Sequence, residues 1–517
     1  VSGTLRHAAM KVLLLACAFL AMAAATPDFK QWPNLLEVST RPWLYEMTQQ
    51  YGYLISLSNV PDAELDAIQA DGITALYALG MWSLGPYGLA HDRTDPGLLS
   101  SYAQTLPDYT VDDIIGSCFA VTSYTINPEI GTEDDLVTFR QRLHSRGIAL
   151  YLDFVPNHSA VDSVHMSEHN EYFIHAPKGQ TSPYDPSTYL PDGTAFGKDK
   201  YGNVWTDTAQ YNYWDTMTYH ARIMELQTVA SFADGIRCDM AMLALNSQIA
   251  DIWSYTLTTW GYTAPEEEFW SAAIRAVKQV YPDTIFMAEV YWGLGQDLLD
   301  TGFDYVYDKE GLYDTLSGEY LDNIRNYIKY TSYDYLSHGT HFIENHDEGR
   351  AVEHFGSVPV ADAAGLITFT LPGMKFHFQG QWVGKRNKLD VHLRRSYAEA
   401  DSTEAEDLYG ALLPMLNDDV WHLGTYTYDD VWGTDDCWRL MSWRYEYNGV
   451  KVVVIANFSD QSGSGRVSVP NAGNGSDSIV ITEKLSGAEY TRSASDMRDN
   501  GLFVIVDAWD AQIFYYP

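Results

Sequence analysis

The sequence predicts a (β/α)8 barrel of parallel strands with an irregular insertion after the third strand, followed by a C-terminal antiparallel β-sandwich. Short buried strands alternate with amphipathic helices over most of the chain, which favours parallel strands joined by crossover helices. After Leu416 the sequence pattern changes to short runs of alternating apolar and polar residues, separated by Gly, Asn and Ser turns. This pattern is typical of a β-sandwich. No Gly-rich dinucleotide fingerprint follows any predicted strand, which disfavours an open doubly wound sheet.

Bounded apolar runs predict the eight strands of the barrel, in the order 42–47, 73–81, 148–154, 234–239, 284–290, 303–307, 340–344 and 374–378. Helical spacing of apolar residues predicts the main helices, at 61–70, 133–145, 214–230, 266–280 and 311–329. Residues 26–40 are expected to form an extended lead-in. Residues 84–112 are expected to form a loop rich in Gly, Pro and Asp, long enough to suggest a function.

These elements divide the chain into a leader and two domains. Residues 1–25 resemble a signal peptide: Met10 and Lys11 precede an apolar run that ends in small residues, and residues 1–9 would be upstream of the true start. This predicts a secreted or lumenal protein. The barrel is assigned to 26–416, its insertion to 157–213 and the sandwich to 417–517.

Composition excludes some partners. The formal net charge of −37 argues against nucleic acid and anionic membranes, which both require basic surfaces. Three cysteines remain after the predicted signal peptide, Cys118, Cys238 and Cys437, and this odd number argues against a disulfide framework. The large core must therefore carry the stability of the fold.

Four predicted strands end in polar residues. The third strand leads into Asp153, and the sequence continues to Asn157 and His158; the fourth carries Arg237 and Asp239, the fifth Glu289, and the seventh leads to His346 and Asp347. Any one of these could be a helix cap or a buried ion pair, and either histidine alone could be a satisfied core residue. The C-terminal ends of all barrel strands meet on one face, so four such ends together predict an active site.

The chemistry that this face supports is glycoside cleavage, which uses one ionised carboxylate and one protonated carboxyl. We expect Arg237 to keep Asp239 ionised, because a nearby cation lowers a carboxyl pKa. We expect the apolar surroundings of Glu289 to suit a general acid and base. Asp347 can stabilise positive charge on the sugar ring, and His158 and His346 can bind its hydroxyls.

These four stretches resemble the conserved regions of the α-amylase family, glycoside hydrolase family 13, and the resemblance extends over roughly residues 40–517. It implies that Asp239 is the nucleophile, Glu289 the acid/base and Asp347 the transition-state stabiliser. It also implies contacts to the reacting sugar and a calcium ligand at Asn157, while no organic cofactor is expected; the sugar contacts would come from Arg237, His158, His346, Asp153 and Phe119.

The chain departs from the family pattern on the leaving-group side. Many α-amylases follow the nucleophile with a basic pair, whereas here the residues from Met240 to Leu243 are all apolar. This predicts a short apolar leaving-group side and a preference for oligosaccharides over long starch chains.

Several functions remain open from the sequence. The first is a retaining hydrolase that cleaves α-glucosidic bonds in α-glucans or maltooligosaccharides. The second is a transglycosylase on the same residues, and the third is a non-catalytic glucan-binding protein, which is disfavoured because all three acidic residues are present. A metal-dependent barrel hydrolase would need a third histidine at a strand end to complete a zinc set.

Overall fold

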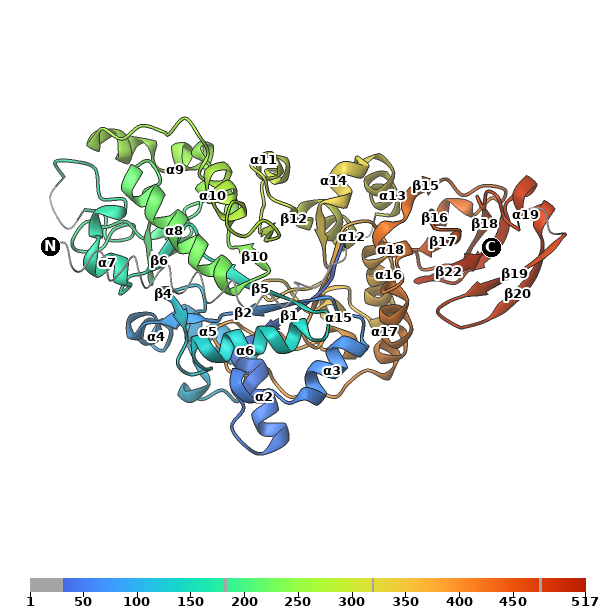
Figure 1. The fold of residues 1–517 in the computed structure, drawn as a ribbon, viewed down its shortest axis with the longest axis horizontal. Helices are drawn as coiled ribbons and strands as arrows, with labels where there is room; N and C mark the ends of the chain where they lie inside the picture. The colour runs from blue at the N-terminus through green and yellow to red at the C-terminus, as the bar shows by residue number, and fades with distance from the viewer. Residues whose placement is uncertain (1–30, 181–183, 319, 474–476) are drawn as a thin grey trace.

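The computed structural model describes residues 31–180, 184–318, 320–473 and 477–517, so the predicted signal peptide lies outside the described residues. Eight parallel strands close into a barrel, which confirms the predicted fold (Figure 1). In order around the barrel the strands are β1 (Asn34–Ser39), β2 (Ala75–Leu79), β5 (Ala149–Phe154), β10 (Gly235–Cys238), β11 (Ile285–Ala288), β12 (Tyr305–Tyr307), β13 (Gly339–His341) and β14 (Met374–Phe378).

The first strand was predicted wrongly. Residues 42–47 belong to helix α2 (Thr40–Tyr51), and β1 lies in the stretch expected to be a lead-in. A short apolar run fits a buried strand or a buried helix equally well. Pro42 stands in the first turn of α2, where a proline ring and its missing N–H are tolerated.

Four of the predicted crossover helices are present: α3 (Asp62–Ala70), α6 (Glu133–His144), α8 (Thr216–Phe232) and α10 (Phe269–Lys278). The single helix predicted at 311–329 is wrong in its extent, because that stretch holds the short elements η5 (Lys309–Tyr313) and α12 (Asp314–Ser317) before α13 (Leu321–Tyr330). Helix α6 shows why they form. Thr132 and Asp135 make a reciprocal capping box at its N-terminus, and Leu136, Phe139 and Leu143 bury one face. Among the described residues, no helix is both long and apolar enough to span a bilayer.

The residues between β2 and the next barrel strand are not a plain loop. The segment 80–120, called the β2 loop below, holds α4 (Pro86–Asp92) and α5 (Pro96–Thr105). Both helices begin with a proline, a residue favoured at the first helical position. The insertion after β5 contains short strands and the helix α7 (Val164–Glu168), and it lies at the opposite end of the molecule from the C-terminal domain (Figure 1).

The C-terminal domain has a six-stranded antiparallel sheet and a two-stranded sheet, β18 (Gly463–Val467) with β21 (Leu502–Val506). One face of the large sheet packs on the barrel, where Trp443 Nε1 and Tyr445 Oη both donate to Thr370 O. The other face shares a core with the small sheet. The strands of the large sheet are β15 (Thr425–Asp429), β16 (Leu440–Tyr447), β17 (Val450–Asn457), β22 (Asp510–Tyr516), β19 (Ser478–Glu483) and β20 (Glu489–Ser493).

Side chains alternate between the inside and the outside of the barrel wall. The ring of Phe376 on β14 meets the rings of Tyr77, Tyr307 and Phe342 inside the barrel. Lys375, its neighbour on β14, therefore points outward toward the helices. Arg237 points inward, below the C-terminal rim of the barrel.

Candidate active site

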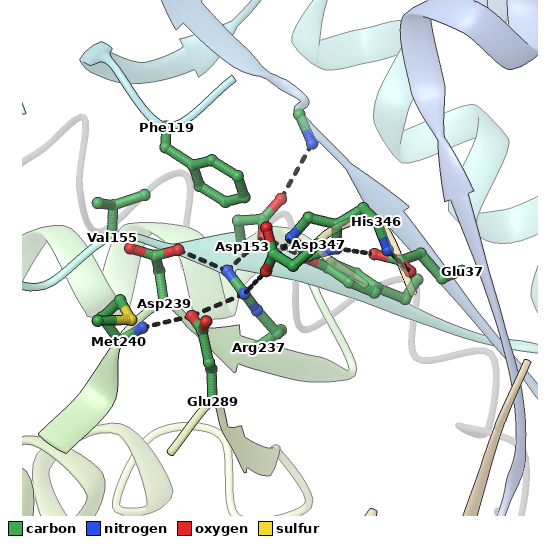
Figure 2. Close-up of polar contacts among 12 residues, drawn as sticks. Glu37, Phe119, Asp153, Val155, Arg237, Asp239, Met240, Glu289, His346 and Asp347 are labelled. Carbon is green, nitrogen blue, oxygen red and sulfur yellow. Dashed lines mark hydrogen bonds and ion pairs between the residues drawn. The ribbon is translucent and has the colours of Figure 1, made fainter. Parts of the chain in front are cut away.

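Strands β10 and β11 bring three charged groups together inside the barrel. Arg237 Nη1 lies 2.8 Å from Asp239 Oδ1, and Arg237 Nη2 lies 2.8 Å from Glu289 Oε2 (Figure 2). β10 and β11 are paired neighbours, and in their register Arg237 lies opposite Met287, so Asp239 and Glu289 follow at the ends of adjacent strands. One guanidinium thus holds both carboxylates at the same rim.

Glu289 is the most tightly held of the carboxylates. Its Oε2 accepts hydrogen bonds from Arg237 and from the Met240 backbone N–H at 2.6 Å, and its Oε1 accepts from Tyr291 Oη at 2.8 Å. The side chain is 4% exposed. Met240 can donate in this way because its backbone takes a left-handed conformation, with φ of 40°.

Asp347 faces these two carboxylates from the loop after β13. His346 Nε2 lies 3.0 Å from Asp347 Oδ2, and the other ring nitrogen of His346 bonds the fully buried Glu37 on β1. Burial disfavours the charged imidazole, but Asp347 and Glu37 outweigh this and raise the pKa of His346 well above its usual value. Burial also acts to raise the pKa of Asp347, but the charge and hydrogen bond of His346 outweigh it and hold that pKa well below its usual range.

The pKa of Asp239 shifts in the direction opposite to the sequence-based expectation. Burial, and next the charge of Glu289, raise the pKa of Asp239 above its usual value, while Arg237 acts in the opposite direction. The predicted Arg237–Asp239 ion pair is present, but its effect is smaller than that of removing the carboxylate from water. The two carboxylates share one guanidinium, so Arg237 offsets only part of this effect.

A cavity of about 560 Å³ opens above these groups. Its volume is in the range of small-molecule sites. Five of the predicted site residues line it: Phe119, His158, Asp239, Glu289 and Asp347. Asp347 is the most open of the three acids, with 43% of its side chain exposed.

Three predicted substrate contacts, Asp153, Arg237 and His346, do not line this cavity. The carboxylate of Asp153 accepts from Tyr77 Oη and from the Gly80 backbone N–H, and it lies 3.8 Å from Arg237 Nη1. Both ring nitrogens of His346 face carboxylates. Asp153 and Arg237 point from β5 and β10 into the barrel, and His346 lies between Glu37 and Asp347, so these side chains support the carboxylates from below.

Asn157 was predicted to bind calcium. Its side-chain oxygen accepts a hydrogen bond from Gln210 Nε2 at 2.8 Å, and its backbone oxygen accepts from the same nitrogen at 2.9 Å. Among the described residues no cluster of acidic, His or Cys side chains could hold a metal, whereas calcium prefers six to eight oxygen ligands. Calcium binding at Asn157 therefore stays a prediction.

Sequence reasoning missed four residues that shape the site: Glu37, Tyr77, Tyr291 and Lys388. Glu37 lies between Leu36 and Val38 on β1, and a carboxylate among apolar strand residues is a signal that the expectation of an extended lead-in hides. Tyr291 follows Glu289 by two residues, and its hydroxyl donates to that carboxylate, which the apolar character of the stretch does not indicate. Lys388 donates to Asp347 O, and its electrostatic effect lowers the pKa of Asp347, but nothing in its own sequence context indicates this.

The apolar residues that replace a basic pair divide into two sets. Met240 lines the cavity beside Glu289, whereas Met242 and Leu243 are buried in the core. The chain therefore presents one apolar side chain, and not two cations, on the side of Glu289.

A (β/α)8 barrel with three carboxylates around a buried arginine at its C-terminal rim defines a carbohydrate-cleaving barrel enzyme. A sequence model of the alpha amylase catalytic domain matches residues 119–420, more than half of the chain. The chain therefore belongs to the α-amylase family of glycoside hydrolases, as its four motifs predicted.

Individual relatives are distant. Alpha-amylase 3 of Dictyoglomus thermophilum is 25% identical over 321 residues, covering 57% of this chain and 59% of that protein. Alpha-amylase MalA of Haloarcula japonica is 24% identical over 397 residues, covering 72% of this chain and 51% of that protein. The chain thus spans between half and three fifths of the length of these two relatives.

The solved structure of an alpha-amylase from Lactobacillus plantarum has the same fold. It matches with a TM-score of 0.66 at 20% identity, covering 94% of this chain and 99% of that one. A noncanonic maltogenic alpha-amylase from Thermotoga neapolitana matches with the same TM-score at 17% identity.

Proposed function

We propose that this protein hydrolyses α-glucosidic bonds in α-glucans or maltooligosaccharides with retention of configuration. The observation that supports this most is the single guanidinium of Arg237, 2.8 Å from both Asp239 and Glu289. Retaining glycosidases hold their two carboxyls about 5–5.5 Å apart, whereas inverting enzymes leave about 6.5–9.5 Å for a water. A shared guanidinium on adjacent strands favours the shorter separation.

In the first half of the reaction, the Glu289 carboxyl gives its proton to the glycosidic oxygen while an Asp239 oxygen bonds to the anomeric carbon. The bond from that carbon to the leaving oxygen breaks. In the second half, water gives one proton to Glu289, its hydroxyl bonds to the anomeric carbon, and the bond to Asp239 breaks. Asp347, with its depressed pKa, stays ionised and stabilises the positive charge that develops on the sugar ring.

The leaving group lies on the side of Glu289, where Met240 and Tyr291 line the cavity. An apolar side chain there gives no charged contact to a long chain, so we propose a preference for oligosaccharides. The names of the relatives, all α-amylases or an α-glucosidase, agree with α-linked glucose as the substrate class.

Proton NMR during the first minutes of maltooligosaccharide hydrolysis tests the stereochemistry. Two displacements at the anomeric carbon invert it twice, so the α-anomer should appear first and the β-anomer only by later mutarotation. A first product in the β-form would exclude Asp239 as the nucleophile.

A further inference from the structure

The cavity extends well beyond the catalytic carboxylates. Asp239, Glu289 and Tyr291 come from the ends of β10 and β11, while the distant part of the lining comes from the β2 loop, the insertion and the segment 379–402, called the β14 loop. β2 and β14 flank β1 on the other side of the barrel from β10 and β11. Since Glu289 protonates the leaving oxygen, the sugar that is transferred to Asp239 must extend toward this far end.

The β2 loop and the insertion are tied together across the far end. The Ser117 backbone N–H donates to Asp92 at 2.9 Å, and Asp92 lies 3.2 Å from His91 Nδ1. The other ring nitrogen of His91 lies 2.9 Å from Thr206 Oγ1 in the insertion. The side chain of Asp92 is only 1% exposed, so these contacts form part of the packed interior and not of the solvent-exposed surface.

The β2 loop is also tied to the β14 loop. The Ile115 backbone N–H donates to His392 O, and the Arg394 backbone N–H donates to Asp113 O, both at 2.8 Å. Arg395 adds an ion pair to Asp113 at 3.0 Å. A small hydrophobic core lies beneath this junction, formed by Tyr102, Leu106, Ile114 and Leu393.

Two polar side chains at the far end of the cavity have hydrogen-bonding atoms available to a ligand. Asp207 follows Thr206 and lines the cavity, and no other residue in the described part of the chain donates a hydrogen bond to its carboxylate. His392 also lines the cavity; its Nδ1 is held by Asp390 at 2.8 Å, which leaves Nε2 for a ligand. A carboxylate and an imidazole facing one cavity suit the hydroxyls of a sugar ring.

We propose that the β2 loop, the insertion and the β14 loop close the far end of the cavity, and that Asp207 and His392 there bind hydroxyls of a terminal, non-reducing sugar. This inference rests on the proposed function, and it makes the protein a chain-end enzyme that releases short units from α-glucans. Cleavage inside a long chain needs a groove open at both ends. Here a continuing chain would have to break the His91–Thr206 and Ile115–His392 contacts.

A pair of substrates tests the closed end: maltoheptaose carrying a chromogenic aryl group at its reducing end, with and without an ethylidene group across the terminal 4- and 6-hydroxyls. With the wild-type protein, the blocked form should lose on the order of 100-fold in kcat/KM, because two buried hydrogen bonds and the fit to the wall are lost. Equal rates on both forms, with products from internal bonds, would overturn the closed end.

Binding separates this inference from the proposed function. Calorimetric titration of Glu289→Gln with maltotriose and with its ethylidene-blocked form needs no turnover, and only the unblocked sugar should bind. If neither aryl substrate is turned over but this difference persists, the proposed hydrolysis fails and the closed end holds. Equal binding of both sugars overturns the closed end whatever the activity.

Variants test the two side chains. Asp207→Asn and His392→Gln should each raise KM for maltotriose about 10-fold with kcat little changed, since each variant weakens one hydrogen bond in which a charged group takes part. Glu168→Gln is the matched control, because this exposed carboxylate lies in the same insertion but outside the cavity. Unchanged KM in both cavity variants would overturn their assignment.

Discussion

Two buried cations on the barrel wall have opposite surroundings. Arg237, on the inner face of β10, is fully buried and has Asp239, Glu289, Asp153 and Asp347 within 4.0 Å. Lys375, on the outer face of β14, is also fully buried, but its only described hydrogen bond goes to Gly373 O at 3.4 Å. The first charge is surrounded by opposite charge and the second has no described ion pair.

The difference shows in the effect of burial on each charge. The carboxylates around Arg237 outweigh burial and raise the pKa of its guanidinium well above the usual value. For Lys375 burial acts alone and lowers the pKa of the amine to about 7. Around Arg237 the fold holds carboxylates in a reactive arrangement, whereas at Lys375 burial only disfavours the charge.

The largest expected effect falls on the carboxylates around Arg237. Asp239→Asn and Glu289→Gln should each lower kcat at least about 10³-fold, since positioned acid/base catalysis alone contributes ~10²–10⁴. Both changes keep the side-chain volume, so circular dichroism should match the wild type. Near-normal turnover of maltotriose by either folded variant would assign the chemistry to other residues.

Removing the inner cation should destabilise the fold. Arg237→Gln leaves buried carboxylates uncompensated, which typically costs about 3–5 kcal/mol of unfolding free energy, measured by urea denaturation at pH 7. Arg275→Gln is the control, because Arg275 pairs with Glu267 on the surface and should change stability by less than ~0.5 kcal/mol. If the two variants are equally stable, Arg237 does not hold the carboxylates together.

Removing the outer cation should instead raise the unfolding free energy. Lys375→Met should stabilise the protein by about 1–4 kcal/mol at pH 7, the range found when buried ion pairs are replaced by apolar residues, because the lone amine has no described ion-pair partner that would be left uncompensated. Lys329→Met, at an exposed pair with Asp430, is the control and should have little effect.

The gain from Lys375→Met should depend on pH. The unfolded chain holds the Lys375 proton up to a pKa near 10.5, whereas the folded chain releases it near pH 7. Stability rises with pH wherever the unfolded state binds more protons, so Lys375 is most costly at pH 7 and below. The difference between Lys375→Met and wild type should therefore shrink from pH 7 toward pH 10, and a constant difference would show that charge is not its origin.

The contacts around Arg237 differ in how far the sequence predicts them. Arg237, Asp239 and Glu289 could be placed because strand alternation and strand order fix where they lie. The contact between Glu37 and His346 could not, because it joins residues 309 positions apart. It depends on β1 closing the barrel against β14, and the strand that carries Glu37 was assigned to the wrong residues.

Other misses have the same physical origin. The His91–Thr206 contact and the burial of Lys375 depend on how loops and helices pack around the barrel, which local periodicity does not encode. The direction of the Asp239 pKa shift was missed because a sequence shows the neighbouring Arg237 but not the depth of burial.

The smallest expected effect concerns Tyr291, which contacts Glu289 on the side away from Arg237. Tyr291 Oη donates to Glu289 Oε1 at 2.8 Å, and burial together with the Glu289 charge raises the pKa of Tyr291 well above its usual value, so it remains an O–H group. Tyr291→Phe removes this bond, but Arg237 and the Met240 N–H still hold Glu289 Oε2. Glu289 should therefore keep its position. Only Oε1, the oxygen that would carry the transferred proton, loses its hydrogen-bond donor.

The effect should therefore depend on the leaving group. We expect Tyr291→Phe to lower kcat about 10-fold on maltotriose, whose leaving sugar needs a proton, because a hydrogen bond to a charged group contributes roughly 1.5–3 kcal/mol. An aryl glycoside with an acidic phenol needs little protonation and should react at nearly the wild-type rate. Tyr255→Phe, on the exposed face of α9 (Asn246–Trp260), is the matched control. Equal losses on both substrates would mean that Tyr291 acts by packing, and that Arg237 and Met240 alone position the acid.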